Sequence, residues 1–209
     1  MRLFLLRHGQ TAWNSEKRAQ GHCDTELDET GIAQADSIAA FLSTREVGTV
    51  HTSDLRRCLQ TAERVAAACS APLIKTPLLR ERNFGSLEGR PYDEVRTAIQ
   101  QKAVQIGCSN FDARPEGGES FQDVWHRLDP FVASLGQEGQ VQTAVSHAGT
   151  IGLLIAKLIE AGPASARNFR ISNCSLTELQ RREDNSWTLV RLNDCSHLEK
   201  TDEGLGIGA

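Results

Sequence analysis

The alternation of short apolar runs with helical stretches constrains the fold of this chain more than any other feature. Leu3 to Leu6 is a continuous apolar run of the kind that forms strands buried on both faces. From Glu29 to Leu42 apolar residues recur at helical spacing, and a second strand is predicted from Gly48 to Ser53. A further helix and an extended segment from Leu73 to Lys75 repeat this order. Such alternation predicts a mostly parallel sheet with helices on both faces.

The remainder of the chain extends the same pattern and adds an antiparallel element. Helices are predicted from Tyr92 to Val104 and from Glu119 to Leu135, the second bent at Pro130. A strand from Val141 to Val145 leads into a helix from Thr150 to Ile159, and the segments Leu176–Gln180 and Trp187–Leu192 indicate an edge hairpin. We therefore predict an α/β three-layer sandwich, as one domain over residues 1–195 with a helical insertion at about 85–135. The segment 196–209 is expected to be a flexible tail.

Composition limits the classes of partner. The chain has 209 residues, and its net charge of -4 gives no general attraction to nucleic acid or to an anionic membrane. An anionic substrate must therefore be bound by local positive charge. The opening apolar run is too short for a secretory signal or a membrane span, and the six cysteines form no C-x-x-C pair. These features predict a cytoplasmic protein with reduced thiols, without a disulfide framework or a metal site.

Polar clusters follow three of the predicted strands directly. They are Arg7-His8-Gly9, the segment Ser53 to Arg57, and Ser146-His147-Ala148-Gly149. Ser53 or Asp54 is expected to cap the helix that follows. Because ligands of parallel sheets bind beyond the carboxyl ends of the strands, these clusters should meet in one pocket. The other histidines are expected to be surface or ordinary polar residues, namely His22, His51, His126 and His197.

Five segments in this order resemble the motifs of the histidine phosphatase superfamily, which includes the cofactor-dependent phosphoglycerate mutases. They are Leu6-Arg7-His8-Gly9-Gln10-Thr11-Ala12-Trp13-Asn14, Arg18-Ala19-Gln20-Gly21, Ser53 to Ala62, Glu81-Arg82-Asn83-Phe84-Gly85 with Glu88-Gly89, and Ser146 to Gly149. The resemblance extends to about Leu192.

The resemblance implies a reaction and a set of residues. His8 would attack the phosphorus atom and form a phosphohistidine, while Arg7, Arg57 and His147 would neutralise the charge of the transferring group. Glu81 would protonate the leaving oxygen, and neither a metal nor a cofactor would be needed. The expected partner is a small phosphorylated substrate. The residues expected to line its pocket are Asn14, Gln20, Gly21 and Asn173.

Three functions remain in contention, and hydrolysis of a phosphomonoester is the first choice. Mutases carry a longer, arginine-rich segment after the acid-bearing loop, whereas residues 90–118 contain only scattered basic residues. Glu116-Gly117-Gly118-Glu119-Ser120 resembles the small bacterial phosphatase branch, including α-ribazole phosphatases. A phosphoglycerate mutase is the alternative, and a non-catalytic phospholigand-binding module is a third reading. The sequence leaves open the identity of the substrate and the oligomeric state, for which a homodimer is one option.

Overall fold

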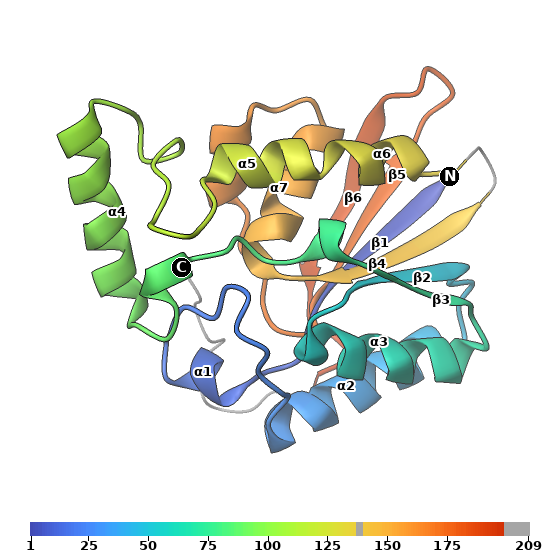
Figure 1. The fold of residues 1–209 in the computed structure, drawn as a ribbon. Helices are drawn as coiled ribbons and strands as arrows, with labels where there is room; N and C mark the ends of the chain where they lie inside the picture. Colours follow the sequence, from blue (N-terminus) through green and yellow to red (C-terminus); the bar gives the residue numbers. More distant parts are fainter. Residues whose placement is uncertain (137–139, 199–209) are drawn as a thin grey trace.

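The computed structural model describes residues 1–136 and 140–198, and its centre is one six-stranded sheet (Figure 1). The strands lie in the order β3-β2-β4-β1-β5-β6. Strands β3, β2, β4 and β1 are parallel, whereas β5 pairs antiparallel with β1, and β6 pairs antiparallel with β5. This arrangement confirms the predicted α/β sandwich with its edge hairpin. The bounds are β1 Arg2–Arg7, β2 Thr49–Ser53, β3 Leu73–Thr76, β4 Val141–Ser146, β5 Leu176–Arg181 and β6 Trp187–Asp194.

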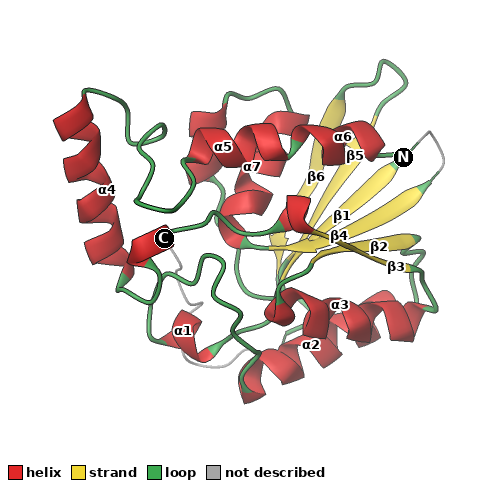
Figure 2. Cartoon of the chain, in the orientation of Figure 1, coloured by secondary structure: helices red, strands yellow, loops and turns green. Residues whose placement is uncertain are grey.

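Helices cover both faces of the sheet (Figure 2). One face carries α2 (Glu29–Leu42) and α3 (Arg56–Cys69), and the other carries α5 (Phe121–Arg127), α6 (Asp129–Ser134) and α7 (Ala148–Leu158). The short α1 (Ala12–Ser15) and the longer α4 (Tyr92–Ile106) lie to the side of the sheet (Figure 1). Three 3-10 turns complete the regular structure of the described residues, namely Pro77–Leu79, Gly85–Leu87 and Pro163–Asn168.

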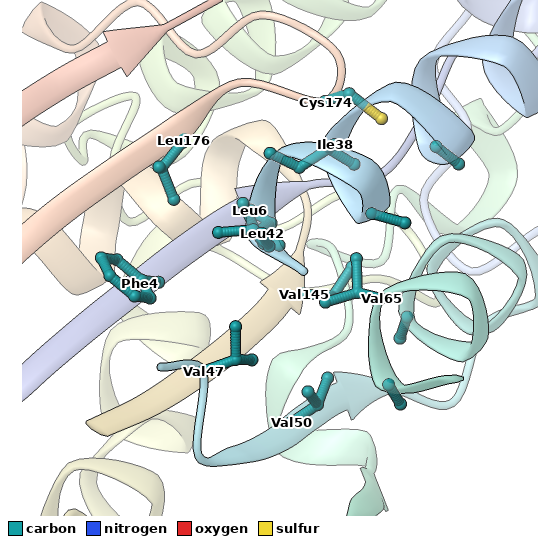
Figure 3. Close-up of a cluster of buried hydrophobic side chains, with 14 of the residues drawn as sticks. Phe4, Leu6, Ile38, Leu42, Val47, Val50, Val65, Val145, Cys174 and Leu176 are labelled. Atoms are coloured by element: carbon teal, nitrogen blue, oxygen red, sulfur yellow. The ribbon is translucent and has the colours of Figure 1, made fainter. Parts of the chain in front are cut away.

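The alternation of β1 divides the core into two layers. Phe4 and Leu6 point into the cluster under α2 and α3, whereas Leu3 and Leu5 point into the cluster under α5, α6 and α7. Figure 3 shows the first cluster, in which Leu42 packs with strand residues including Leu6. Because successive side chains of a strand point to opposite faces, one apolar run supplies both layers.

A third and smaller cluster lies under α4, away from the sheet. Its buried members are Ala19, Phe84, Val95, Ile99, Ala103 and Ala113. The segment that joins β3 to α4 contacts this cluster through Phe84, while Leu79, nearer to β3, is buried in the cluster under α5, α6 and α7.

Two sequence predictions about helix ends are wrong, for reasons that the structure shows. Leu55, and not Ser53 or Asp54, occupies the N-cap of α3, and it makes no side-chain capping bond. Both polar side chains have tertiary partners instead, because Ser53 lies against His147 and Asp54 binds Arg80 through both carboxylate oxygens.

The predicted helix from Glu119 to Leu135 is also divided. α5 ends at Arg127, and Leu128 separates it from α6, which has Pro130 in its first turn. Proline has no N–H to donate to the preceding turn, so it starts a new helix more readily than it continues an old one.

The end of the chain lies partly outside the description. Of the predicted tail, residues 196–198 are described, and Leu198 packs against the first core cluster. Residues 199–209 lie outside the described residues. Within the described parts, no helix is long and apolar enough to cross a membrane.

Candidate active site

Parallel pairing of β1 with β4 brings the two histidines together. Arg7 and Ser146 are partners in register at the ends of these strands, and His8 and His147 follow them directly. Their ring centroids are 5.1 Å apart, with an angle of 60° between the planes. Both side chains are buried, as are those of Arg7 and Arg57. The structure thus places all three predicted polar clusters at one edge of the sheet.

The surroundings of His8 leave one ring nitrogen ready to react. Nδ1 lies 2.7 Å from the carbonyl oxygen of Gly9, which can only accept, so Nδ1 carries the proton. Burial lowers the pKa of His8 well below 6.5, and the charges of Arg57 and Arg7 lower this pKa further. The imidazole is therefore neutral near pH 7, and Nε2 holds a free lone pair. This is the form that a nucleophile needs.

The loop that carries His8 is fixed by its backbone. The amide of Gly9 donates to Oγ1 of Thr61 on α3, at 3.1 Å. Gly9 also lies directly against Gly31 in the first turn of α2, where a Cβ on Gly9 would stand 2.4 Å from the carbonyl oxygen of Gly31. Only glycine permits this approach of loop and helix.

Arg57 is held on three sides by groups from distant segments. Nη1 donates to the carbonyl of Cys23 and Nη2 to that of Gly21, both at 2.8 Å, and Nε donates to Nδ1 of His147 at 3.3 Å. Burial lowers the pKa of Arg57 from its ordinary value, but a guanidinium stays charged in proteins. Its orientation is therefore set before any ligand arrives.

Arg7 makes fewer side-chain hydrogen bonds than Arg57. Nη1 donates to the carbonyl of Ile171 at 2.7 Å, and the buried Nε has no partner among the described residues. Burial lowers the pKa of this guanidinium too. Two fixed positive charges thus flank the histidine pair, as binding of a phosphate dianion requires.

The bond from Arg57 also sets the tautomer of His147. Since a guanidinium only donates, Nδ1 of His147 accepts, and its Nε2 carries the proton. Nε2 lies 3.1 Å from Oγ of Ser53 and 3.4 Å from Sγ of Cys58. Burial lowers the pKa of His147 well below 6.5, with Arg57 as the next cause. Burial also raises the pKa of Cys58 to about 12, so this sulfur remains a thiol.

Glu81 reaches the site from the loop between β3 and α4. Its carboxyl lies at the start of α7, where Oε2 accepts from the amide of Gly149 at 3.2 Å. Thr150 Oγ1 lies 3.3 Å from Glu81 Oε1 and 2.8 Å from the carbonyl of Arg80. A hydroxyl has one proton, so Thr150 donates to one of these two oxygens at a time. A Cβ at position 149 would lie 2.7 Å from Oε1, so glycine leaves room for the carboxyl.

The predicted pocket residues divide into three groups. Asn173 Nδ2 donates to the carbonyl of His8 at 2.9 Å and lies 3.3 Å from Oδ1 of Asn14, so these two amides lie beside the nucleophile. Gly21 contributes its carbonyl to Arg57, and its φ of +51° suits glycine. Gln20 is buried, and its amide oxygen accepts from Thr25 at 2.6 Å, so this side chain is bonded within its own loop.

Several residues near Glu81 were not identified from the sequence. His22 was expected to be an ordinary polar residue, yet its Nε2 lies 2.9 Å from the carbonyl of Glu81. Arg82 is only 3% exposed and stacks on the rings of Phe84 (4.6 Å) and Phe121 (4.1 Å). Its Nε and Nη1 have no partner in the described part of the chain. Adjacency to Gly21 and Glu81 in their motifs was the one signal that could have identified His22 and Arg82.

Comparisons with known proteins agree with this geometry. The curated relative "Probable phosphoglycerate mutase GpmB" of Yersinia pestis is 32% identical over 205 residues, which are 95% of each chain. The α-ribazole phosphatase of Shigella flexneri superposes with a TM-score of 0.82 at 31% identity, over 93% of this chain and 96% of that chain. Phosphoserine phosphatase of Entamoeba histolytica, in complex with 3-phosphoglyceric acid, gives a TM-score of 0.82 at 27% identity, over 94% and 98%.

The family model described as "Histidine phosphatase superfamily (branch 1)" matches residues 3–195, which include every residue of the site built above. The match spans the sheet, the helices on both faces and the loop that carries Glu81. The chain belongs to the histidine phosphatase superfamily.

Proposed function

We propose that this protein is a phosphomonoesterase that hydrolyses a small phosphorylated metabolite through a phosphohistidine on His8. The observation that carries the proposal is a neutral, buried imidazole whose Nδ1 is fixed by Gly9 and which lies between two buried guanidinium groups. A positively charged pocket around an uncharged nucleophile favours attack on a phosphate dianion, because the charges attract the substrate without protonating the attacking nitrogen.

The reaction follows in two displacements. In the first, Nε2 of His8 bonds to phosphorus as the bond from phosphorus to the leaving oxygen breaks, and Glu81 gives its proton to that oxygen. Arg7, Arg57 and His147 stabilise the charge on the transferring group. In the second, water attacks the phosphohistidine and releases phosphate. The ionised Glu81 takes the proton of this water, so His8 and Glu81 both return to their starting states.

Hydrolysis is favoured over mutase activity by the state of the basic residues in the segment 90–118. Arg96 is ion-paired with Asp93, and Arg114 binds Asp123 through both oxygens, and all three bonds lie at exposed positions. Neither arginine is available as a clamp for a second phosphate. A mutase must also keep its phosphohistidine from water between turnovers, which a second clamp would support. The name of the Yersinia relative keeps the mutase as the second candidate.

The first experiment measures turnover of p-nitrophenyl phosphate in the presence of EDTA. We expect full activity, since the proposed groups are all side chains, and activity abolished by EDTA would contradict the mechanism. The mutase is tested with 3-phosphoglycerate, with and without 2,3-bisphosphoglycerate. Interconversion that depends on the bisphosphate would replace hydrolysis as the conclusion, and no reaction in any tube would support a binding module.

The second experiment substitutes the nucleophile. His8→Ala should abolish turnover together with an acid-labile, base-stable phosphorylation that intact-mass analysis detects after a quench with substrate. His126→Ala is the matched control, because its side chain is exposed and lies on α5. A phosphorylated or active His8→Ala protein would show that another group is the nucleophile.

A cytoplasmic setting is part of the proposal and is supported by the cysteines. All six are free, and the most buried, Cys58 and Cys174, have pKa values raised by burial, so they pack as inert thiols.

A further inference from the structure

Arg127 binds the backbone of the loop that carries Glu81 at several points. It is the last residue of α5, and its side chain is 17% exposed. Its Nη1 shares its two hydrogens among the carbonyls of Pro77 (3.2 Å), Leu78 (2.7 Å) and Arg80 (3.0 Å), and its Nη2 donates to that of Glu81 (3.1 Å).

Side chains bind these carbonyls because the loop has left the sheet. β3 ends at Thr76, and the chain from there to α4 forms no ladder with another strand. A backbone carbonyl without a partner costs free energy, and Arg127 is a donor shared by four of them, two of which also contact Thr150 and His22. Its guanidinium therefore helps to fix the path of the loop. That path determines where the Cα of Glu81 lies.

Glu119 binds both Arg127 and the chain that follows Glu81. Its carboxylate accepts from Nε and Nη2 of Arg127, at 3.0 and 3.2 Å, and Oε2 also accepts from the amide of Asn83 at 2.9 Å. The amide of Glu119 in turn donates to the carbonyl of Asn83 at 2.8 Å. The ion pair therefore holds the chain both before and after Glu81, while the amide of Gly149 holds the carboxyl itself.

We propose that Arg127, supported by Glu119, is the positioning residue that sets the distance between Glu81 and the leaving oxygen of the substrate. This inference rests on the proposed function, in which Glu81 is the general acid. Arg127 itself bonds to backbone carbonyls and to Glu119, and its effect on the reaction passes through Glu81. Small displacements of a catalytic group are sufficient to slow a reaction strongly.

The dependence on leaving group separates positioning from a merely structural role. p-Nitrophenolate is a stable leaving group that needs little help from an acid, whereas an alkoxide must be protonated as it departs. We therefore expect Arg127→Met to lower kcat/KM for an alkyl phosphate by about 10²-fold, the range of general acid catalysis, and to change kcat/KM for p-nitrophenyl phosphate little. kcat/KM is the proper quantity because it reports the step that forms the phosphohistidine.

Two further variants guard against a simple folding defect. Arg127→Lys keeps the charge but loses the planar fork, so its loss on the alkyl phosphate should lie between those of the wild type and Arg127→Met. Glu119→Gln should show the same selective loss to a smaller degree. Arg114→Met is the matched control, since Arg114 also binds a carboxylate of α5 and makes no bond to the loop of Glu81. It should leave both values of kcat/KM unchanged.

Equal losses on the two substrates, or none, in Arg127→Lys and Glu119→Gln proteins of wild-type melting temperature would overturn the inference. That outcome is distinct from a failure of the proposed function. If His8→Ala retained activity, the mechanism itself would fall, whereas a normal His8→Ala result with an unchanged preference between leaving groups would remove only the role of Arg127.

Discussion

The side of the site that faces the phosphoryl group and the side that faces the leaving group are held in different ways. Arg7, His8, Arg57 and His147 stand at the ends of central strands and at the first turn of α3, between the two large core clusters. Glu81 lies on a loop outside the strands, between Leu79 in the second large cluster and Phe84 in the small cluster under α4, and bonds of arginine side chains also hold that loop. Strand pairing thus fixes the positions of the groups that bind and attack the phosphoryl group, which every phosphomonoester has. The position of Glu81 depends instead on loop side chains, which vary more readily.

Substituting Arg57 should cause the largest loss of activity, because it removes a positive charge from the side of the site that faces the phosphoryl group. In Arg57→Met the carbonyls of Gly21 and Cys23 lose their donor, and His147 loses the bond that sets its tautomer. We expect turnover of p-nitrophenyl phosphate to fall by about 10³-fold or more, as for other arginines that stabilise phosphoryl transfer. Arg56→Met is the control, since this neighbouring arginine is exposed and pairs with Glu26. Similar losses in the two variants would contradict the assignment.

Gly149→Ala tests whether the start of α7, next to His147, also fixes the position of the Glu81 carboxyl. The added methyl group would lie 2.7 Å from Oε1 of Glu81 and should displace the carboxyl, so kcat/KM for an alkyl phosphate should fall by about 10²-fold. Stability should not fall, because alanine is favoured over glycine in a helix by about 1 kcal/mol. Activity assays and urea unfolding measure the two effects. Unchanged activity in the variant would mean that Glu81 does not act from this position.

The pH dependence of stability near pH 6 should trace largely to His8 and His147 on the phosphate side, since burial lowers the pKa of His51 and His197 less. The folded-state pKa values of His8 and His147 lie below 6.5, so the unfolded chain takes up protons first as the pH falls. Their contribution is complete above about pH 6.5 and is lost below it, by up to about 1.4 kcal/mol per pH unit for each histidine until its folded pKa is reached. Urea unfolding at a series of pH values measures this slope.

A substitution checks that assignment of the slope. His147→Gln should make the slope between pH 6.5 and 5.5 shallower, whereas His126→Gln should preserve it because that side chain is exposed. A slope in His147→Gln as steep as that of the wild type would assign the effect to other groups.

The sequence predicted the strand-borne part of the molecule well and the loop-borne part poorly, for a physical reason. Periodicity located α2 at Glu29–Leu42 and placed His8 and His147 at one edge of the sheet. It could not show that Ser53 contacts His147, or that Leu55 takes the N-cap position of α3. Capping preference is local, and a tertiary partner overrode it.

The same limit explains the residues that pattern reasoning missed. Arg127 is a helix-terminal arginine like many others, and its contact with four carbonyls depends on the path of a loop about 50 residues earlier in the chain. The bond of Gln20 to Thr25 and the approach of His22 to Glu81 are likewise properties of folded loops. No spacing along the chain encodes such contacts.

The contact between Gly9 and Gly31 couples a surface helix to the chemistry. Each position excludes a side chain, because a Cβ on Gly31 would stand 2.0 Å from the carbonyl of Gln10, and a Cβ on Gly9 would meet Gly31 in turn. The first turn of α2 and the turn after β1 therefore share one backbone surface with no slack between them. Warming that loosens the first turn of α2 should therefore also displace the turn that carries His8, so loss of turnover reports the undocking of this helix.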